Sequence, residues 1–172
     1  MPTSSDEEQA AKFVPQTLEP TTATCNCGAV ELELKNPQMT MACHCHDCRG
    51  RNGTLAAYLV TSKSADVIVA KGDDNITTFG KSHPDGSNKG PRVCFCKTCG
   101  THTHYKSFGG AVTQVPLCLT AIKDQIQDVG LHIWKSSSVP CSKGIFESAQ
   151  VPVFDGLPSG APMDAFMAII KD

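Results

Sequence analysis

The chain has 172 residues and ten cysteines, and its length suits one domain with a hydrophobic core of its own. The formal net charge is −2, and Lys and Arg are scattered along the chain, so we expect no nucleic-acid partner. Residues 1–8 are polar and lack the apolar segment of a secretory signal, and no apolar run approaches the roughly 18 residues of a membrane span. We therefore expect a cytoplasmic protein with no membrane partner, in which thiols stay reduced.

The N-terminal residues 1–20 contain three prolines among Ser, Thr, Gln and Glu, a composition that predicts a mobile acidic tail. After it, Val30, Leu32 and Leu34 alternate with charged residues, which is the period of a half-buried strand. Further short apolar runs are separated by Gly-, Asp- and Pro-rich turns, and they lie at residues 55–60, 67–69, 76–79, 93–95, 101–105 and 115–119. The pattern predicts a mainly β, mainly antiparallel domain over residues 21–160.

The C-terminal residues 161–172 form an extension with a different pattern. Four apolar side chains recur there at the spacing of one helix face, namely Met163, Phe166, Met167 and Ile170. We expect a short helix that packs on the core or forms a dimer contact, so a homodimer is one prediction. Residues 81–90 are the longest polar segment, which is typical of either a lid or a solvated turn.

Seven cysteines form three short clusters. They are the pair Cys25 and Cys27, the trio Cys43, Cys45 and Cys48, and the pair Cys96 and Cys99. Zinc in a structural site takes four ligands, so seven cysteines complete one site and leave three. Each pair is followed by a glycine that lets the backbone fold back toward the sulfurs. The two pairs therefore predict a structural zinc site that ties the first strand to the middle of the chain.

The middle trio predicts a second zinc site, of the catalytic kind. Three sulfurs within six residues can surround one ion but leave its fourth position open to water or an exogenous thiolate. Three alternatives remain. The cysteines could form disulfides, which the lack of a secretory signal disfavours; the second site could be structural and closed by His44, His46 or another residue; and iron could replace zinc in the four-cysteine site.

Histidines near the clusters are candidates for proton transfer, because imidazole changes its charge near neutral pH. His44 and His46 flank Cys45, and His102 and His104 share one side of the strand expected after the last pair. We take Cys45, His46 and His104 as the catalytic candidates. Plain exposure, or a hydrogen bond to a ligand, is the alternative for each histidine.

Two cysteines outside the clusters also carry predictions. Cys118 alternates with two leucines, which favours a small buried hydrophobic residue. Cys94 lies two residues before Cys96 and could face the same side, toward the metal.

The motifs Cys-x-Cys-Gly, Cys-His-Cys-x-x-Cys and Phe-Cys-x-x-Cys-Gly occur in this order at residues 25–28, 43–48 and 95–100. This order resembles that of the glutathione-dependent formaldehyde-activating enzyme (GFA) and centromere protein V family, and softer similarity extends the match over roughly residues 22–158. The resemblance implies stacked antiparallel β-sheets pinned by zinc knuckles. It also implies two zinc ions per chain, a structural one on the two pairs and a catalytic one on the trio.

The resemblance further implies a zinc-dependent carbon–sulfur lyase. Its substrate would be an adduct between a thiol, glutathione in the founding activity, and a small electrophilic carbon such as an aldehyde. Two alternatives stay open. One is a non-enzymatic structural zinc module for protein binding, and the other is a lyase for larger glutathione conjugates in detoxification or biosynthesis.

Overall fold

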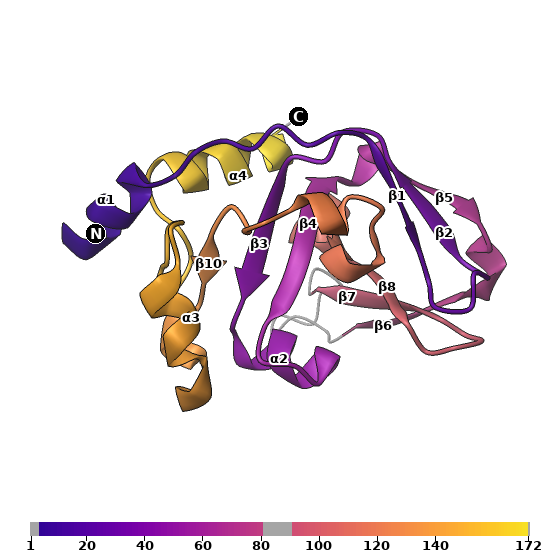
Figure 1. Cartoon of the computed structure of the whole chain (residues 1–172). Helices are drawn as coiled ribbons and strands as arrows, with labels where there is room; N and C mark the ends of the chain where they lie inside the picture. Colours follow the sequence, from indigo (N-terminus) through magenta and orange to yellow (C-terminus); the bar gives the residue numbers. More distant parts are fainter. Residues whose placement is uncertain (1–3, 81–90, 172) are drawn as a thin grey trace.

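The computed structural model of the chain describes residues 4–80 and 91–171, and its regular structure is mainly β (Figure 1). Its smaller sheet has the strand order β1 (Thr21–Thr24), β2 (Glu31–Leu34) and β5 (Val67–Lys71). Its larger sheet has the order β10 (His132–Ile133), β3 (Met39–Cys43), β4 (Ala57–Lys63), β9 (Val112–Pro116), β8 (His102–Ser107), β7 (Arg92–Cys96) and β6 (Ile76–Gly80). Residues 81–90, for which the sequence allows a lid or a solvated turn, lie outside the described residues.

The helices lie mainly toward the ends of the chain. The α-helices are α1 (Ser4–Ala11), α2 (His46–Asn52), α3 (Lys143–Ser148) and α4 (Ala161–Lys171). Short 3-10 turns span Ser64–Asp66, Asp73–Asn75, Phe108–Gly110, Leu117–Leu119, Lys123–Gln125, Lys135–Ser137 and Pro140–Ser142. Among the helices of the described residues, none combines the length and apolar character that crossing a membrane requires.

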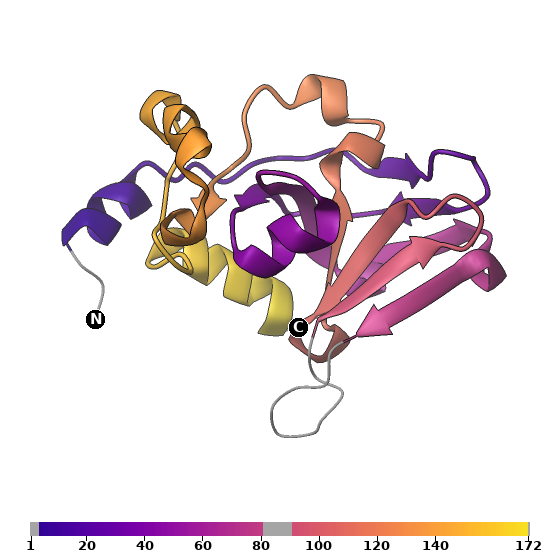
Figure 2. The same ribbon diagram turned by 90° about the horizontal axis from the view of Figure 1, so that it is seen from below.

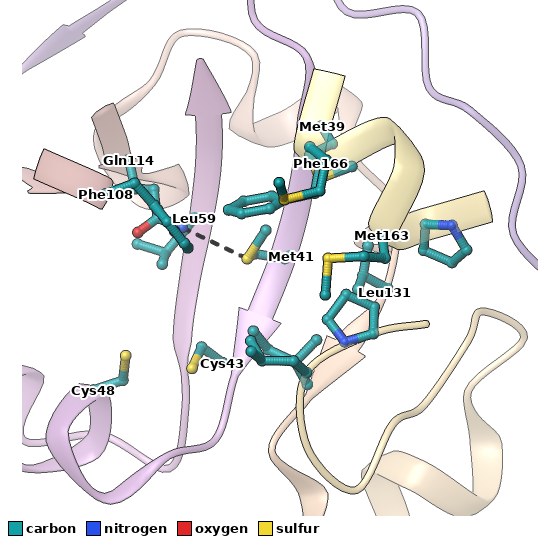
Figure 3. A pocket seen from close by; sticks show the side chains of 15 residues that line it. Met39, Met41, Cys43, Cys48, Leu59, Phe108, Gln114, Leu131, Met163 and Phe166 are labelled. Atoms are coloured by element: carbon teal, nitrogen blue, oxygen red, sulfur yellow. Dashed lines mark hydrogen bonds between the residues drawn. The ribbon is translucent and has the colours of Figure 1, made fainter. Parts of the chain in front are cut away.

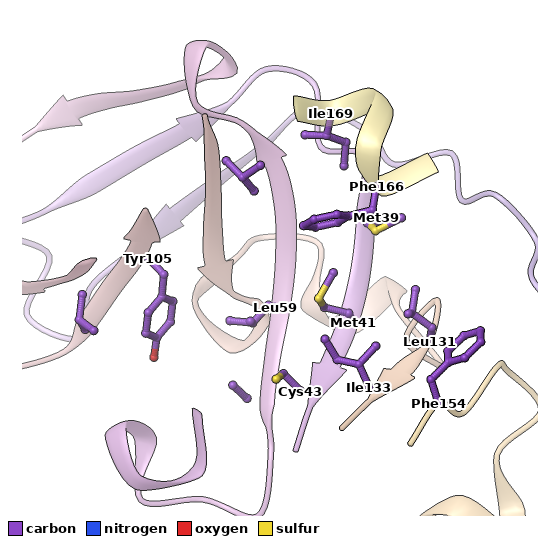
Figure 4. Close-up of a cluster of buried hydrophobic side chains, with 13 residues drawn as sticks. Met39, Met41, Cys43, Leu59, Tyr105, Leu131, Ile133, Phe154, Phe166 and Ile169 are labelled. Carbon is purple, nitrogen blue, oxygen red and sulfur yellow. The ribbon is translucent and has the colours of Figure 1, made fainter. Parts of the chain in front are cut away.

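Strand β4 separates two hydrophobic cores. Neighbouring residues of a strand point to opposite faces, and Leu59 and Val60 do so here. Leu59 belongs to a buried cluster with Phe166 and Ile169 of α4 (Figure 4), whereas Val60 belongs to a cluster with Leu32 of β2. The smaller sheet thus covers one face of the larger sheet, and α4 covers the other.

The predicted fold class is confirmed, with one refinement of the strand pairing. The named strands pair antiparallel, as expected, except that β10 pairs parallel with β3. All five residues of β3 are buried. This strand therefore lacks the alternation of buried and exposed residues that predicts a half-buried strand such as β2.

The predicted C-terminal helix is also confirmed. Helix α4 begins after Gly160, whose φ of +61° suits glycine, and Pro162 lies in its first turn, where its missing N–H is not needed. Phe166 and Ile169 are buried in the core, and Met163 is half-buried beside them. The apolar face predicted from the sequence therefore packs on the body of the protein.

At the N-terminus, where the sequence predicts a mobile tail, the structure has helix α1, which contacts α4, and an extended segment that leads to β1 (Figures 1 and 2). The side-chain oxygen Oε1 of Gln16 accepts hydrogen bonds from the backbone N of Thr40, at 2.7 Å, and from its hydroxyl, at 2.8 Å. Gln9 Oε1 accepts another from the backbone N of Val153 at 3.0 Å. Glutamine amides thus bind backbone groups that the polar composition alone does not reveal.

The last predicted strand ends earlier than expected. At Pro116 the chain leaves the sheet and enters the 3-10 turn Leu117–Leu119, so the alternation expected through residue 119 stops. Cys118 is exposed as a result, and the prediction that it is buried is wrong.

Candidate metal centres

Four of the cysteines come together although they lie up to 74 positions apart in the sequence. The sulfurs of Cys25, Cys27, Cys96 and Cys99 all lie within 4.8 Å of one another. The distance from Cys27 Sγ is 3.6 Å to Cys25 Sγ and 3.8 Å to Cys96 Sγ. Four sulfurs bound to zinc at about 2.3 Å would form a tetrahedron with edges of about 3.8 Å. The geometry and the soft thiol donors therefore fit a four-coordinate zinc ion, and we call this group the four-cysteine centre.

Two glycine turns shape the four-cysteine centre. Gly28 and Gly100 have φ values of +72° and +71°, a conformation that other residues rarely adopt. In these turns the backbone N of Gly28 donates to Cys25 O, and that of Gly100 donates to Cys96 O, both at 2.9 Å. Each turn therefore brings both cysteines of its pair to the same side.

Hydrogen bonds reach two of these sulfurs from outside the turns. The backbone N of Val30 donates to Cys25 Sγ at 3.3 Å, and the side-chain amide of Asn75 donates to Cys96 Sγ at 3.2 Å. Donors of this kind spread the negative charge of a thiolate and fix its orientation. Cys25 and Cys96 are buried in the core around the smaller sheet, whereas Cys27 and Cys99 are exposed, so the centre lies at the edge of this core.

The other three cysteines meet at the end of β3. Cys43 is the last residue of β3, Cys45 is the N-cap of α2, and Cys48 lies inside that helix. Their sulfurs lie within 4.8 Å of one another, and the backbone N of Cys48 donates to Cys45 Sγ at 3.4 Å. Three soft donors with this spacing could hold a zinc ion and leave one coordination position for another ligand. We call this group the three-cysteine centre.

The three thiols share protons unequally. Hydrogen bonds from the thiols of Cys43 and Cys48 lower the pKa of Cys45 to about 2. The same contacts raise the pKa of Cys43, through Cys45, and of Cys48, chiefly through Cys43. One thiolate at the N-cap of α2 is therefore stable at neutral pH, which is the form in which cysteine binds metal ions.

Arg49 fixes the backbone around the three-cysteine centre. Its Nε donates to the backbone O of His44 at 3.1 Å, and its guanidinium NH2 group donates to Ser137 O at 2.8 Å. Helix α2 then ends at Gly53, whose φ is +61°. The short helix that carries Cys48 is thus held at both of its ends.

The predicted histidines lie at different places. His46 is the first residue of α2 and is exposed. The ring of His44 points away to His132, with 3.1 Å between Nε2 and Nδ1, and packs on Phe146. His104 is buried, is paired with Cys94 of β7, and has its Nδ1 3.1 Å from the hydroxyl of Thr103. In the described part of the chain, none of the three has a hydrogen bond to a sulfur of the three-cysteine centre.

A β-bulge explains the position of His104. Cys94 and Phe95 are neighbours on β7, but their partners on β8 are His104 and His102, so β8 carries an extra residue there. Such a bulge re-aims side chains. The prediction that His102 and His104 share one side of the strand is therefore wrong, and Cys94 pairs with His104 instead of joining the four sulfurs.

Two residues that the sequence analysis missed lie beside Cys48. The hydroxyl of Tyr105 donates to Asn52 Oδ1 at 2.5 Å, and Asn52 Nδ2 donates to Cys48 O at 2.7 Å. His102 Nδ1 lies 3.4 Å from the same Asn52 oxygen. Burial raises the pKa of Tyr105 to about 12, so this phenol keeps its proton at neutral pH. Cys48 and Asn52 are four residues apart in a helix, and this spacing is a signal that could have revealed the hydrogen bond between them.

A cavity of about 270 Å³ adjoins the three-cysteine centre. The cavity is lined by Cys43 and Cys48, by apolar residues of β3, β4, β10 and α4, and by the loops around residues 108 and 157 (Figure 3). Gln114 is the one described lining residue with a polar side chain other than the two cysteines. None of the four sulfurs of the other centre lines it. Of the two centres, only the three-cysteine centre therefore opens into this apolar space.

The fold and the two centres define a mainly β protein with two cysteine groups that could hold zinc. Residues 20–137 match the model of the family described as glutathione-dependent formaldehyde-activating enzyme (GFA). The chain belongs to this family, so the resemblance stated from the motifs is confirmed. All seven clustered cysteines lie inside the matched residues.

The crystal structure of a protein from Rhodobacter sphaeroides is similar, at 26% sequence identity and a TM-score of 0.49. The similar region covers 63% of this chain and 96% of that chain. No curated protein has a significant match.

Proposed function

We propose that the protein is a zinc-dependent carbon–sulfur lyase. Its substrate would be the adduct of a thiol, glutathione by analogy with the family description, and an aldehyde or another small electrophilic carbon. One observation carries the proposal: two of the three cysteines in the three-cysteine centre line a cavity, whereas none of the cysteines of the four-cysteine centre lines it. A metal centre with three protein ligands and adjoining space is typical of catalysis, and a closed centre of four is typical of a structural site.

The reaction is redox neutral. In cleavage, the carbon–sulfur bond breaks and its electron pair stays on sulfur. The hydroxyl group of the adduct carbon loses its proton and becomes the carbonyl oxygen of the aldehyde, and one proton returns to the thiolate product. A bound zinc ion would supply Lewis acidity that stabilises the sulfur anion.

The chain's own residues supply the site around this chemistry. Cys43, Cys45 and Cys48 are the proposed ligands of the catalytic zinc, and the four-cysteine centre is the proposed structural site. Tyr105 keeps its phenolic proton at neutral pH and is oriented by Asn52. Tyr105 is not among the described residues that line the cavity, but the charge of Cys48 contributes to its raised pKa, so we propose its hydroxyl as a group that holds a proton beside the three-cysteine centre.

The two predicted proton-transfer histidines differ in what supports them. His46 stays a candidate because it is exposed next to Cys45. His104 is buried beside Cys94, and none of the described cavity-lining residues is His104. We therefore give His104 a packing role in place of the predicted catalytic one.

Three remaining expectations are also proposals. The ten cysteines are free thiols, which supports a reducing compartment such as the cytoplasm. The absence of a basic cluster in the sequence supports a small-molecule partner over a nucleic acid. A homodimer is a prediction that sedimentation can test.

Replacing Cys45 by Ala tests the proposed function. The zinc-loaded enzyme should accelerate exchange between a free aldehyde and its glutathione adduct, measured by NMR exchange spectroscopy. In Cys45→Ala this rate should fall by at least about a hundredfold, because a three-ligand centre with one ligand missing holds its metal poorly. The matched control is Cys141→Ala, which removes an exposed thiol outside both centres and should keep the wild-type rate. Full activity in Cys45→Ala would exclude the proposal.

A further inference from the structure

We infer that the electrophilic carbon of the substrate carries an apolar group, an aromatic ring or an alkyl chain of roughly six to eight carbons, which occupies the cavity beside the three-cysteine centre. The inference takes its chemistry from the proposed lyase function and adds the class of substrate. It rests on the position, the lining and the size of the cavity and on the residues that close it.

The position of the cavity links its occupant to the reacting atoms. Cys43 and Cys48 line one end, and Met41, Leu131 and Met163 line the space beyond them (Figure 3). A sulfur held at the three-cysteine centre would therefore have its attached carbon next to this space. The substituent of that carbon is the part of the adduct that can extend into the cavity.

The lining of the cavity selects against polar substituents. Apart from the two cysteines, Gln114 is the one polar side chain among the described lining residues, and no charged side chain is among them. The side-chain amide of Gln114 itself donates to Met41 Sδ at 3.7 Å. A carboxylate or ammonium group placed here would lose its hydration with no partner to replace it. The charged ends of glutathione must therefore lie outside, and the aldehyde-derived part lies inside.

The cavity is much larger than a substrate derived from formaldehyde would need. An engineered apolar cavity of roughly 150 Å³ holds one benzene molecule, and this cavity has about 270 Å³. A hydrogen atom on the adduct carbon would leave almost all of this space unused. A ring with a short substituent, or a medium-length chain, would bury its surface there.

The residues that close the cavity, which we call its cover, also suit an apolar ligand. Met163, Phe166 and Met167 of α4 close one side, and methionine side chains adapt to guests of different shape. Phe108 and Leu157 are about half exposed, at 51% and 54%, and also line the cavity. Apolar residues exposed at this place provide an apolar route between solvent and the interior.

Binding of alkanethiols tests the inference without requiring turnover. An alkanethiol reproduces the sulfur, the adjoining carbon and its apolar substituent. The full chain, loaded with zinc, is titrated with ethanethiol, butanethiol, hexanethiol and octanethiol in a calorimeter. We expect the affinity to rise by up to about fourfold for each methylene group that is buried, and to level off between six and eight carbons. An affinity that stays the same from ethanethiol to hexanethiol would overturn the inference.

Matched variants of α4 locate the effect. Met163→Trp fills the cavity and should reduce hexanethiol affinity to about that of ethanethiol. Ala168→Trp puts the same side chain on the exposed face of the helix and should keep the full dependence on length. If Met163→Trp fails to fold, Gln114→Glu places a charge in the wall and should have the same effect. Retention of the length dependence in a folded cavity variant would contradict the inference.

The outcome also separates this inference from the proposed function. If alkanethiols bind with the expected dependence but no glutathione–aldehyde adduct is cleaved, the inference about the cavity stands and the lyase proposal fails. If adducts are cleaved at rates that do not depend on the apolar substituent, the lyase proposal stands and the inference fails.

Discussion

The two cysteine centres use the same ligand in different surroundings. The four-cysteine centre joins two turns that lie far apart in the sequence, and backbone and side-chain groups donate hydrogen bonds to its sulfurs. The three-cysteine centre lies within one short segment, and two of its cysteines line an apolar cavity. The number of thiols alone therefore does not determine the role of each centre. We propose that the connection made by the first centre is structural and that the space beside the second serves catalysis.

The sharpest way to test this contrast is to remove one sulfur from each centre. Cys96→Ala should abolish the folded state, since a structural zinc site contributes folding free energy of roughly 10 kcal/mol or more. Cys48→Ala should leave a folded protein that binds one zinc ion per chain, because its centre connects residues that are already close in the sequence. Thermal unfolding followed by circular dichroism, together with metal analysis, measures both effects. Equal loss of stability in the two variants would remove the distinction between the centres.

A smaller effect on stability should come from acid, through a buried histidine in the hairpin that carries Cys96 and Cys99. Burial lowers the pKa of His104 on this hairpin to about 4, below the ordinary value of 6.5. The folded state therefore binds this proton less well than the unfolded state. The contribution of neutral His104 to the free energy of unfolding is complete above about pH 6.5 and falls as the pH drops toward 4.

The magnitude follows from the same shift. Between pH 7 and 5 the loss due to His104 should be on the order of 2 kcal/mol. Urea unfolding of the zinc-loaded wild type and of His104→Gln measures it, since acid release of metal affects both proteins. The variant should lose less stability over this interval, and an identical pH dependence in the two proteins would contradict the prediction.

The smallest effect should come from Asn75. Asn75→Ala removes the hydrogen bond from its amide to Cys96 Sγ and should lower the free energy of unfolding by about 1–2 kcal/mol. Adduct cleavage at the three-cysteine centre should keep its wild-type rate. Urea unfolding and the exchange assay measure the two properties. A loss of activity without a loss of stability would show that the centres are coupled more closely than their positions suggest.

Part of this molecule follows directly from its sequence. Thiol ligands require close spacing and turns, so the grouping of Cys25 and Cys27 with the distant Cys96 and Cys99 could be predicted from motifs alone. Half-buried strands such as β2 show their alternation in the sequence, as does the apolar face of α4. Each of these signals lies within a short stretch of the chain, even where two such stretches, like the two cysteine pairs, are far apart.

The remaining features depend on contacts between distant segments. Strand β3 is buried on both faces and has no alternation to read. The contact between Tyr105 and Asn52 joins β8 to α2, and no local pattern specifies it. The bulge that turns His104 away from His102 results from strand pairing. Gln16 likewise gains its partner, Thr40, only when the N-terminal segment lies along β3.

Helix α4 has a consequence for how substrate choice can change. The residues that match the family model end at 137, whereas the helix that closes the cavity begins at Ala161. The proposed metal ligands and the cover of the cavity therefore belong to separate stretches of the chain. Substitutions in the cover can reshape the cavity without touching a metal ligand, so specificity can diverge, or be exchanged by grafting a different C-terminal segment, while the chemistry is retained.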